Sequence, residues 1–404
     1  MGISRLMQKT YPRLRLDIST SDLMAGLGFL GLGNHREAEI NAIQEFWQKE
    51  VLIALSVRTG FDLLLQAWHF PPGSQVLMSG INIENMFAIV QAHNLIPVGV
   101  DLDFETLAPN LKDFAAKINE NTCLCVITHL FGSIVPLDTY AKICQQWGVM
   151  LVEDCAQGFT GKRYLGHSEA DVSLFSFGPI KSATALGGAV VWVKDETLRQ
   201  KMQGIEAQYE FKTRFWYGKR LLKYVVLKFL SQPWIYDKLL LILEQMGQDS
   251  DRAIASLARG FAAGELLPKL RYRPPSPMIA LLRRRLRSRW DSQGRQKTAQ
   301  MFLSCLNNAV LIPGQQTEYH SFWLVAIATH NPTQSIVKLR QNGFDATQGA
   351  TSLRAMSNCP IAKQILDQIL YLPISPFMPE STLLRLAEII NHYTLAAVPI
   401  FKES

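Results

Sequence analysis

Two ionisable side chains with the potential for catalysis follow apolar runs that are typical of strands. Asp154 comes shortly after the run VMLV at 149–152, and Lys181 closes the phrase SLFSFGPIK at 173–181. An acid at the end of one strand and a lysine after the next would meet across one crevice with apolar walls. Burial lowers the pKa of a lysine, and a neutral lysine is a nucleophile toward an aldehyde. The pair therefore predicts carbonyl chemistry.

Each of these features also has a purely structural explanation. A lysine after a strand is more often a solvated loop residue, and an aspartate at a strand end often caps a helix or a turn. Gly187 and Gly188 fit a tight turn before a strand. The motifs 153–157, 173–181 and 187–189 are informative as an ordered set, because each opens or closes a strand.

The elements that must position these motifs alternate between helical and strand patterns from Val51 to Val193. The runs Leu124–Thr128 and Val149–Val152 are apolar on both faces, which is typical of a mainly parallel sheet covered by helices on both sides. We therefore expect an α/β fold. Ligands of such sheets bind at the carboxyl ends of the strands, here 79–82, 101, 129, 153–157 and 176–181.

The alternation stops after about residue 205. Helices are predicted at Arg220–Leu230, Trp234–Met246, Thr333–Asn342 and Ser381–Tyr393, and short strands at Ser321–Thr329 and Phe344–Thr347. The expected domains are an N-terminal segment (1–34), a large α/β domain (35–205), a basic apolar helical insertion (206–275) and a smaller C-terminal α+β domain (276–404).

Composition excludes several classes of protein. Of 404 residues 48% are hydrophobic and 19% charged, which is incompatible with disorder, collagen or a coiled coil. The six cysteines form no C-x-x-C pair, so a reducing compartment and no metal site are expected. The apolar stretch 23–32 is interrupted by glycines and is about half the roughly 20 residues of a membrane span. We expect a cytoplasmic protein without a signal peptide.

Positive charge is concentrated in one region. Residues 212–290 hold 17 Lys and Arg against 5 Asp and Glu, whereas the rest of the chain holds 24 against 29. Two explanations of the insertion stay open: its helices cover a sheet edge or dimer interface, or they lie peripherally on a membrane or lipid, since aromatic residues alternate with Lys219, Arg220, Lys223 and Lys228. No base-reading fold accompanies the basic run 283–285, so no nucleic acid is expected.

The ordered motifs resemble the DegT/StrS family of pyridoxal-phosphate aminotransferases of the sugar-nucleotide type. The family phrases E-D-x-A-Q, F-S-F-x-x-x-K and G-G-A are matched at 153–157, 175–181 and 187–189. The resemblance covers nearly half the chain, from about 34 to 193, and more weakly YLPISPFMP at 371–379. It implies a fold-type-I enzyme with a large α/β domain and a smaller C-terminal domain.

The resemblance also implies roles for individual residues. Lys181 matches the lysine that forms a Schiff base with pyridoxal 5'-phosphate and later moves a proton. Asp154 matches the aspartate that keeps the pyridine nitrogen protonated. Gln157 matches a residue near the ring hydroxyl, and Ser176 a phosphate ligand. His129 has a family counterpart, but a packed strand-end residue explains it equally well.

Two departures concern residues that would contact the cofactor. The phosphate turn of the family, S-G-T-x-A-L, is here Arg58-Thr59-Gly60-Phe61-Asp62-Leu63. A helix that begins at Thr59 and Gly60 still offers N–H groups to a dianion, and Arg58 either adds positive charge there or faces solvent. The aromatic residue that stacks on the cofactor ring in many members falls at Ile83.

Two further departures affect the partner subunit and the substrate. The family's asparagine that reaches the neighbouring subunit's phosphate has no counterpart in 270–282, where Tyr272 or Arg273 would substitute. The His-Tyr pair on the substrate side is absent from 343–356, which puts a sugar substrate in doubt.

The function that the resemblance implies is transamination by a homodimer. An amino acid, by family habit glutamate or glutamine, gives its amino group to the cofactor, which then aminates a ketone or aldehyde, either a sugar or a lipid-linked intermediate. One alternative is other α-carbon chemistry such as dehydration. Lys181 argues against it, because the family's dehydratases have another residue at the position of this lysine. The other is a non-catalytic, membrane-associated relative.

Overall fold

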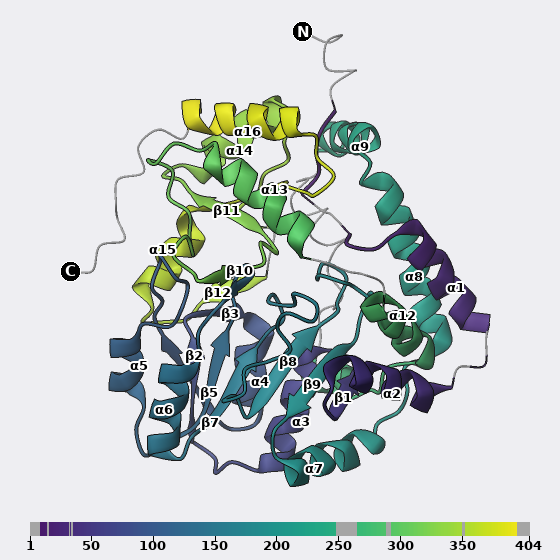
Figure 1. The fold of residues 1–404 in the computed structure, drawn as a ribbon, viewed down its shortest axis with the longest axis vertical. Coiled ribbons are helices and arrows are strands. Elements are labelled where there is room, and N and C mark those ends of the chain that lie inside the picture. Colours follow the sequence, from purple (N-terminus) through teal and green to yellow (C-terminus); the bar gives the residue numbers. More distant parts are fainter. Residues whose placement is uncertain are drawn as a thin grey trace.

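A computed structural model describes residues 9–13, 16–31, 33, 35–247, 265–287, 292–349 and 352–393. A sheet covered by helices forms the lower half of the view in Figure 1, and a smaller group of helices and short strands lies above it. The sheet consists of β1 (Val51–Ala54), β2 (Gln75–Ser79), β4 (Ile96–Val100), β5 (Thr122–Thr128), β7 (Met150–Asp154), β8 (Val172–Ser176) and β9 (Ala189–Val193).

The strands lie in the order β1-β9-β8-β7-β5-β2-β4. All neighbours from β8 to β4 are parallel, whereas β9 is antiparallel to both β8 and β1. The prediction of a mainly parallel sheet is confirmed. Because β7 and β8 are adjacent and parallel, the residues that follow them meet at one edge of the sheet.

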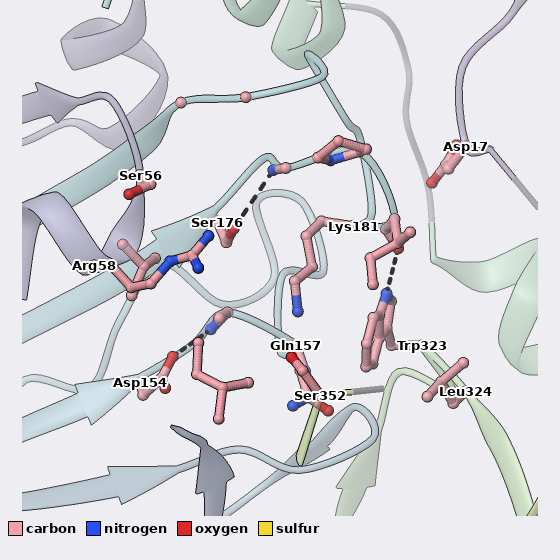
Figure 2. Close-up of a pocket in the computed structure, with 18 of the residues that line it drawn as sticks. Asp17, Ser56, Arg58, Asp154, Gln157, Ser176, Lys181, Trp323, Leu324 and Ser352 are labelled. Atoms are coloured by element: carbon pink, nitrogen blue, oxygen red, sulfur yellow. Dashed lines mark hydrogen bonds between the residues drawn. The ribbon is translucent and has the colours of Figure 1, made fainter. Parts of the chain in front are cut away.

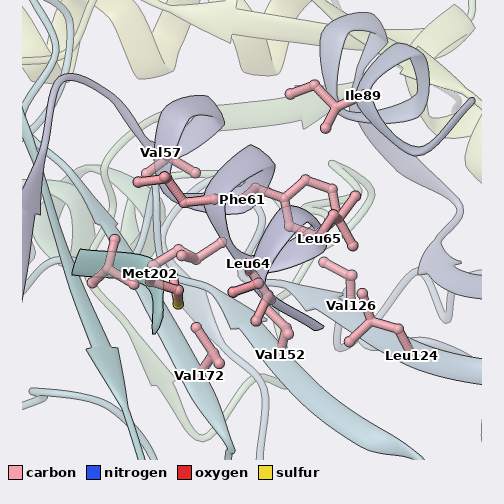
Figure 3. Close-up of a cluster of buried hydrophobic side chains, with 14 of the residues drawn as sticks. Val57, Phe61, Leu64, Leu65, Ile89, Leu124, Val126, Val152, Val172 and Met202 are labelled. Carbon is pink, nitrogen blue, oxygen red and sulfur yellow. The ribbon is translucent and has the colours of Figure 1, made fainter. Parts of the chain in front are cut away.

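Helices cover both faces of the sheet because its central strands are apolar on both sides. On one face are α3 (Val57–Trp68), α4 (Glu84–Ala92) and α7 (Glu196–Ala207); on the other are α5 (Leu111–Lys117) and α6 (Asp138–Trp147). Val126 and Val152 pack with Phe61 of α3 (Figure 3), while Ile127 packs in the core with Tyr140 of α6. Successive strand residues thus enter opposite cores.

The C-terminal part has its own core. It contains α13 (Gln293–Ser304), β10 (Tyr319–His320), β11 (Val325–Ala328), α14 (Pro332–Gln341), β12 (Leu353–Ala355), α15 (Pro360–Gln368), β13 (Ile369–Leu372) and α16 (Glu380–Tyr393). The two helices expected here are confirmed as α14 and α16. Strand β12 pairs with β3 (Ile81–Ile83) and β10 with β6 (Ser133–Ile134), so these ladders join the C-terminal part to residues that follow strands of the large sheet.

One expected strand of this part is wrong. Phe344 and Thr347 form only isolated bridges, with Tyr11 and Tyr371. The partner of β11 is instead β13, which follows α15 without an intervening turn and was not expected. Because β13 pairs with β11, the segment 344–347 contacts β13 through a single bridge, between Thr347 and Tyr371.

The remaining described helices are α1 (Thr20–Gly31), α2 (Arg36–Trp47), α8 (Arg214–Leu230), α9 (Pro233–Gln245), α11 (Leu266–Leu270) and α12 (Ser276–Arg287). Helices α1, α2, α8 and α12 pack together, α9 packs on α8, and α11 packs on α3 and α4. The two helices expected in the insertion correspond to α8 and α9, and its described residues also hold α11; residues 248–264 lie outside the described residues. Helix α8 packs on α1 and α12, and a Cβ at Gly26 would lie 2.8 Å from Leu221 Cδ2, so the close approach requires a glycine there.

Helix α12 also packs against α1 and α2, although the sequence assigned it to the C-terminal domain. The division of the chain into domains stays a prediction. The basic run on α12 meets carboxylates of these two helices. Asp22 lies 2.9 Å from Arg284 and 2.6 Å from Arg285, and Arg283 pairs with Glu39. These arginines therefore form contacts between helices, and their charge is not a free surface patch.

Candidate active site

A cavity of about 680 Å³ lies at the carboxyl ends of β7 and β8, where the sequence predicted a site. Its walls come from the N-terminal turn of α3, the loop between β8 and β9, helix α8 and the C-terminal part. Figure 2 shows Arg58, Asp154, Ser176 and Lys181 gathered around this space. Segments far apart in the sequence thus build one pocket.

Lys181 lies in the loop that joins β8 to β9. The loop is held by Thr184, whose hydroxyl donates a hydrogen bond to the Gly178 carbonyl at 2.6 Å. Burial lowers the pKa of Lys181 to about 8, against the attraction of Asp154, and the charge of Arg58 lowers it further. The amine is therefore far easier to deprotonate than an exposed lysine, as a nucleophile toward a carbonyl requires.

Asp154 closes β7 and is only 4% exposed. The Ala156 N–H donates to its Oδ1 at 3.0 Å. Burial raises the pKa of Asp154, while the Ala156 hydrogen bond, the charge of Lys181 and the amide of Asn82 act in the opposite direction. A carboxylate in this setting is stabilised by any cationic or N–H group placed beside it.

Three more predicted residues line the cavity: Ile83, Gln157 and Ser176. The Gln157 side-chain oxygen accepts from the Phe131 N–H at 2.8 Å, which fixes its orientation. The Ser176 hydroxyl accepts from the Gly178 N–H at 3.4 Å. Ile83 contributes an apolar wall at the end of β3.

The predicted residues Thr59 and Gly60 lie behind the cavity wall. The Ser56 hydroxyl caps α3 by accepting from the Thr59 N–H at 3.2 Å, and the Thr59 hydroxyl donates to the last carbonyl of α11 at 3.0 Å. Gly60 packs against β9, where a Cβ would lie 2.6 Å from Val191. Neither residue lines the cavity, and the turn that does is 56–58, including the predicted residue Arg58.

His129 belongs to a buried polar cluster that does not line the cavity. Its Nδ1 accepts from the Val135 N–H at 3.1 Å, so Nε2 carries the hydrogen and donates toward Glu153 Oε2 at 3.1 Å. Both ring nitrogens are occupied by partners within the fold. Of the two explanations weighed from the sequence, this geometry favours a packed residue.

Glu153 collects the hydrogen bonds of this cluster. It accepts from the hydroxyls of Tyr164 at 2.6 Å and Ser173 at 2.5 Å. Burial alone would raise its pKa, but these donors, with His129 foremost, lower it to about 2. With Cys155 the cluster has the spacing of a possible metal site, yet its ring and carboxylate atoms already serve as hydrogen-bond partners.

Trp323 lines the cavity and was missed by sequence reasoning. Its indole N–H donates to the Ile180 carbonyl at 3.0 Å, across 143 positions of the chain. The Lys181 Nζ lies 4.2 Å from the centroid of the same ring. No local pattern marks this residue, because only the fold brings the β10–β11 segment to the lysine loop.

The insertion also reaches the cavity. Lys212, Trp216 and Arg220 line the wall. Trp216 and Arg220 are four positions apart on α8 and therefore share one face. That spacing was visible in the sequence but gave no indication of which face points inward.

Tyr272 and Arg273, the expected substitutes for the family's asparagine, do not line the cavity. The Tyr272 ring lies 3.2 Å from the Lys212 Nζ. The Arg273 guanidinium lies 4.3 Å from the Phe211 ring and near Glu206, whose pKa burial raises to about 7. Both side chains therefore have partners outside the cavity.

The substrate-side segment 343–356 supplies part of the cavity wall. Gly349, Ser352 and Arg354 line it, and the two residues between Gly349 and Ser352 lie outside the described residues. Arg295 adds a second guanidinium, which donates to the Trp323 carbonyl at 3.1 Å. The wall opposite the sheet is therefore rich in positive charge and suits an anionic ligand.

Comparison with known proteins identifies the relatives of this chain. The model of the DegT/DnrJ/EryC1/StrS aminotransferase family matches residues 24–219. L-glutamine:2-deoxy-scyllo-inosose aminotransferase of Streptomyces fradiae is 29% identical over 157 residues, which are 38% of this chain and 37% of that protein. The matched part thus spans little more than a third of that relative.

Solved structures resemble the whole fold. The aminotransferase TlmJ from Streptoalloteichus hindustanus has a TM-score of 0.70 at 16% identity, covering 95% of this chain and 98% of its own. The E. coli GDP-4-keto-6-deoxy-D-mannose-3-dehydratase, solved with hydrated PLP, has a TM-score of 0.69 at 15% identity. This match covers 95% of this chain and 99% of the dehydratase chain. At such identities the likeness confirms the expected fold, which aminotransferases and a dehydratase share.

Proposed function

The chain belongs, over residues 24–219, to the DegT/DnrJ/EryC1/StrS aminotransferase family, and from this premise we propose that it is a pyridoxal-phosphate aminotransferase. The observation that carries the proposal is a lysine with a pKa of about 8 in one cavity with a buried aspartate. The amino donor is glutamate or glutamine, and the acceptor is a ketone or aldehyde.

The residues of the cavity suit this cofactor. An aldehyde requires an amine, which Lys181 supplies; a protonated pyridine nitrogen requires a carboxylate, which Asp154 supplies. A phosphate requires positive charge and hydroxyls, which Arg58 and Ser176 supply. When bound, pyridoxal phosphate supplies an electron-accepting ring next to the carbon that carries the amino group.

The protein groups then have distinct tasks. Asp154 holds a proton at the ring nitrogen, and its burial makes that charge pairing strong. Lys181, once its amine is free and neutral, would take the proton from the substrate carbon that bears the amino group and hold it on Nζ for the proton transfer that transamination requires. Ile83 and Trp323 provide apolar walls that keep water from the site.

Retention of Lys181 favours transamination over the alternative of dehydration. The sequence relative is named for L-glutamine as amino donor and a cyclic ketone as acceptor, which supports the same pair of substrate classes here. The cationic wall with Arg295 and Arg354 fits a donor carboxylate or an acceptor that carries phosphate. The acceptor is a sugar or a lipid-linked carbonyl compound.

A half-reaction tests the function without knowledge of the acceptor. The purified protein with bound cofactor is mixed with glutamate, glutamine or alanine, and the visible absorbance is followed. Transamination predicts loss of the aldehyde absorbance and release of one keto acid per site with glutamate or glutamine. Absence of keto acid from every amino acid would contradict the proposal.

Two partners belong to the proposal. The first is a second copy of the chain, as the family resemblance implies. The second is an anionic membrane surface, supported by an outward stripe on α8 of exposed Phe215, Leu222, Val226 and Phe229 beside Lys219 and Lys223. No described helix has the length and apolarity to cross a bilayer. The proposal includes a cytoplasmic protein that meets the membrane peripherally through this stripe.

A further inference from the structure

Helix α8 presents one charged side chain, Arg220, to the cavity in a fixed position. Its guanidinium lies 5.4 Å from the Trp216 ring centroid, one turn earlier on the same face. Its Nε donates to the Leu186 carbonyl, in the loop that carries Lys181. The ring on one side and the hydrogen bond on the other hold the guanidinium at the cavity wall.

The loop that accepts this hydrogen bond from Arg220 is also hydrogen-bonded to the two turns that follow β1 and β8. The Gly188 N–H donates to the Leu55 carbonyl at 3.0 Å, and the Phe177 N–H donates to the Gly188 carbonyl at 3.0 Å. Leu55 leads into the turn 56–58, and Phe177 follows Ser176. Arg220, Arg58 and Ser176 therefore border one corner of the cavity.

The electrostatics of this corner indicate an anion. Burial lowers the pKa of Arg58 to about 10, and the positive charge of Arg220 lowers it further. Burial also lowers the pKa of Arg220. Two cations that lose water and repel one another raise the energy of this corner, and a doubly negative group relieves both effects.

On the basis of the proposed function, we propose that Arg220 of the inserted helix and Arg58 of α3 together bind the cofactor's phosphate, with Ser176 beside them. Guanidinium groups bind phosphate through paired hydrogen bonds, and two of them match its two charges. In the family that the chain resembles, a partner-subunit asparagine contributes at this point. Here the same chain supplies the ligand, which gives the insertion a role in the site.

The assignment of Arg220 to the phosphate is tested by measuring cofactor affinity, which requires no turnover. Apoprotein is titrated with pyridoxal 5'-phosphate and with pyridoxal, which lacks the phosphate, and binding is read from tryptophan fluorescence. Arg220→Gln should weaken pyridoxal 5'-phosphate binding by about 10- to 100-fold and pyridoxal binding by less than about 3-fold. Arg220→Lys keeps one charge and should show an intermediate loss.

Lys219→Gln is the matched control, since it removes one positive charge from the neighbouring, exposed position of the same helix. Its affinity for both compounds should equal that of the wild type. Equal weakening toward both compounds in Arg220→Gln would mean that Arg220 only holds the loop at Leu186, and unchanged affinity would also overturn the assignment. A wild-type protein that binds neither compound would refute the proposed function itself, and this inference with it.

Discussion

The Lys181 Nζ lies 4.2 Å from the centroid of the Trp323 ring, and the same indole donates a hydrogen bond to Ile180, the residue before the lysine. One side chain thus fixes both the backbone and the amine of the reactive loop. Contact between an ammonium and an aromatic face is worth about 0.5 to 2 kcal/mol, so Trp323 helps to hold the lysine in place.

Trp323→Phe should therefore lower kcat by about 3- to 10-fold, because it retains a ring and loses the hydrogen bond to Ile180. Trp323→Leu, which loses both, should lower it further. The measurement is single-turnover conversion of the cofactor by glutamate, and the rate constant of this half-reaction is the quantity compared as kcat. Cofactor affinity should change little in Trp323→Phe, and a kcat equal to that of the wild type in both variants would show that Trp323 is only a wall residue.

Asp154→Asn keeps the shape of the side chain and removes its charge. Because the buried carboxylate would hold the ring nitrogen protonated, turnover should fall by about 100-fold or more while the cofactor still binds. Steady-state kinetics and the absorbance of bound cofactor measure the two effects separately. Activity within a few-fold of the wild type would remove Asp154 from the mechanism.

The lowered pKa of Lys181 predicts how its reactivity depends on pH. In the apoprotein only the neutral amine is acylated, so labelling should be half-maximal near pH 8 rather than near the ordinary lysine value of 10.5. Trace labelling with acetic anhydride, read peptide by peptide, gives this midpoint.

Two variants test the cause of that shift. Arg58→Gln removes a charge that lowers the pKa and should move the midpoint upward, whereas Asp154→Asn removes a charge that raises it and should move the midpoint downward. Movement of both midpoints in the same direction would contradict the assigned electrostatics.

Membrane contact is tested through the outward stripe of α8. Each Lys near an anionic bilayer contributes about 1 kcal/mol, so Lys219→Glu with Lys223→Glu should reduce co-sedimentation with phosphatidylserine vesicles. Lys228 is left unchanged because it donates to the Ile18 carbonyl within the fold. Binding should weaken as salt shortens the Debye length from about 10 Å at 0.1 M to about 3 Å at 1 M.

The matched control changes two exposed lysines of α5 and α6, Lys112 and Lys142, to Glu, far from α8 in Figure 1. It removes the same charge and should bind vesicles as the wild type does. Equal losses in both double variants would mean that net charge alone attracts the protein. No binding of the wild type at low salt would leave the stripe as a surface between copies or an ordinary exposed face.

Local sequence patterns predicted the large sheet and the central residues of the site, Asp154 and Lys181. The strand before Asp154 and the phrase around Lys181 were readable because apolar runs end at the residues that do chemistry. The sequence placed the phosphate-binding turn at 58–60, whereas the residues at the start of α3 that line the cavity are 56–58. Gly60 is a glycine because β9 packs against it, and Ser56 rather than a ligand satisfies the Thr59 N–H.

Long-range contacts explain what the sequence did not reveal. Trp323 reaches the lysine only after the C-terminal part docks through β10 and β12. The inner face of α8 could not be told from its outer face, since both carry aromatic and basic residues: Arg220 points to the cavity while Lys219 is exposed. The pairing of β11 with β13 was likewise invisible in local periodicity.

The most direct test of the account is to locate the cofactor on the chain. Borohydride makes a bond between lysine and cofactor permanent, and proteolysis with mass spectrometry identifies the peptide. We predict that the label lies on Lys181, and that Lys181→Ala still binds cofactor but yields no labelled peptide. Label on another lysine, or none on the wild type with cofactor bound, would show that Lys181 does not hold the cofactor.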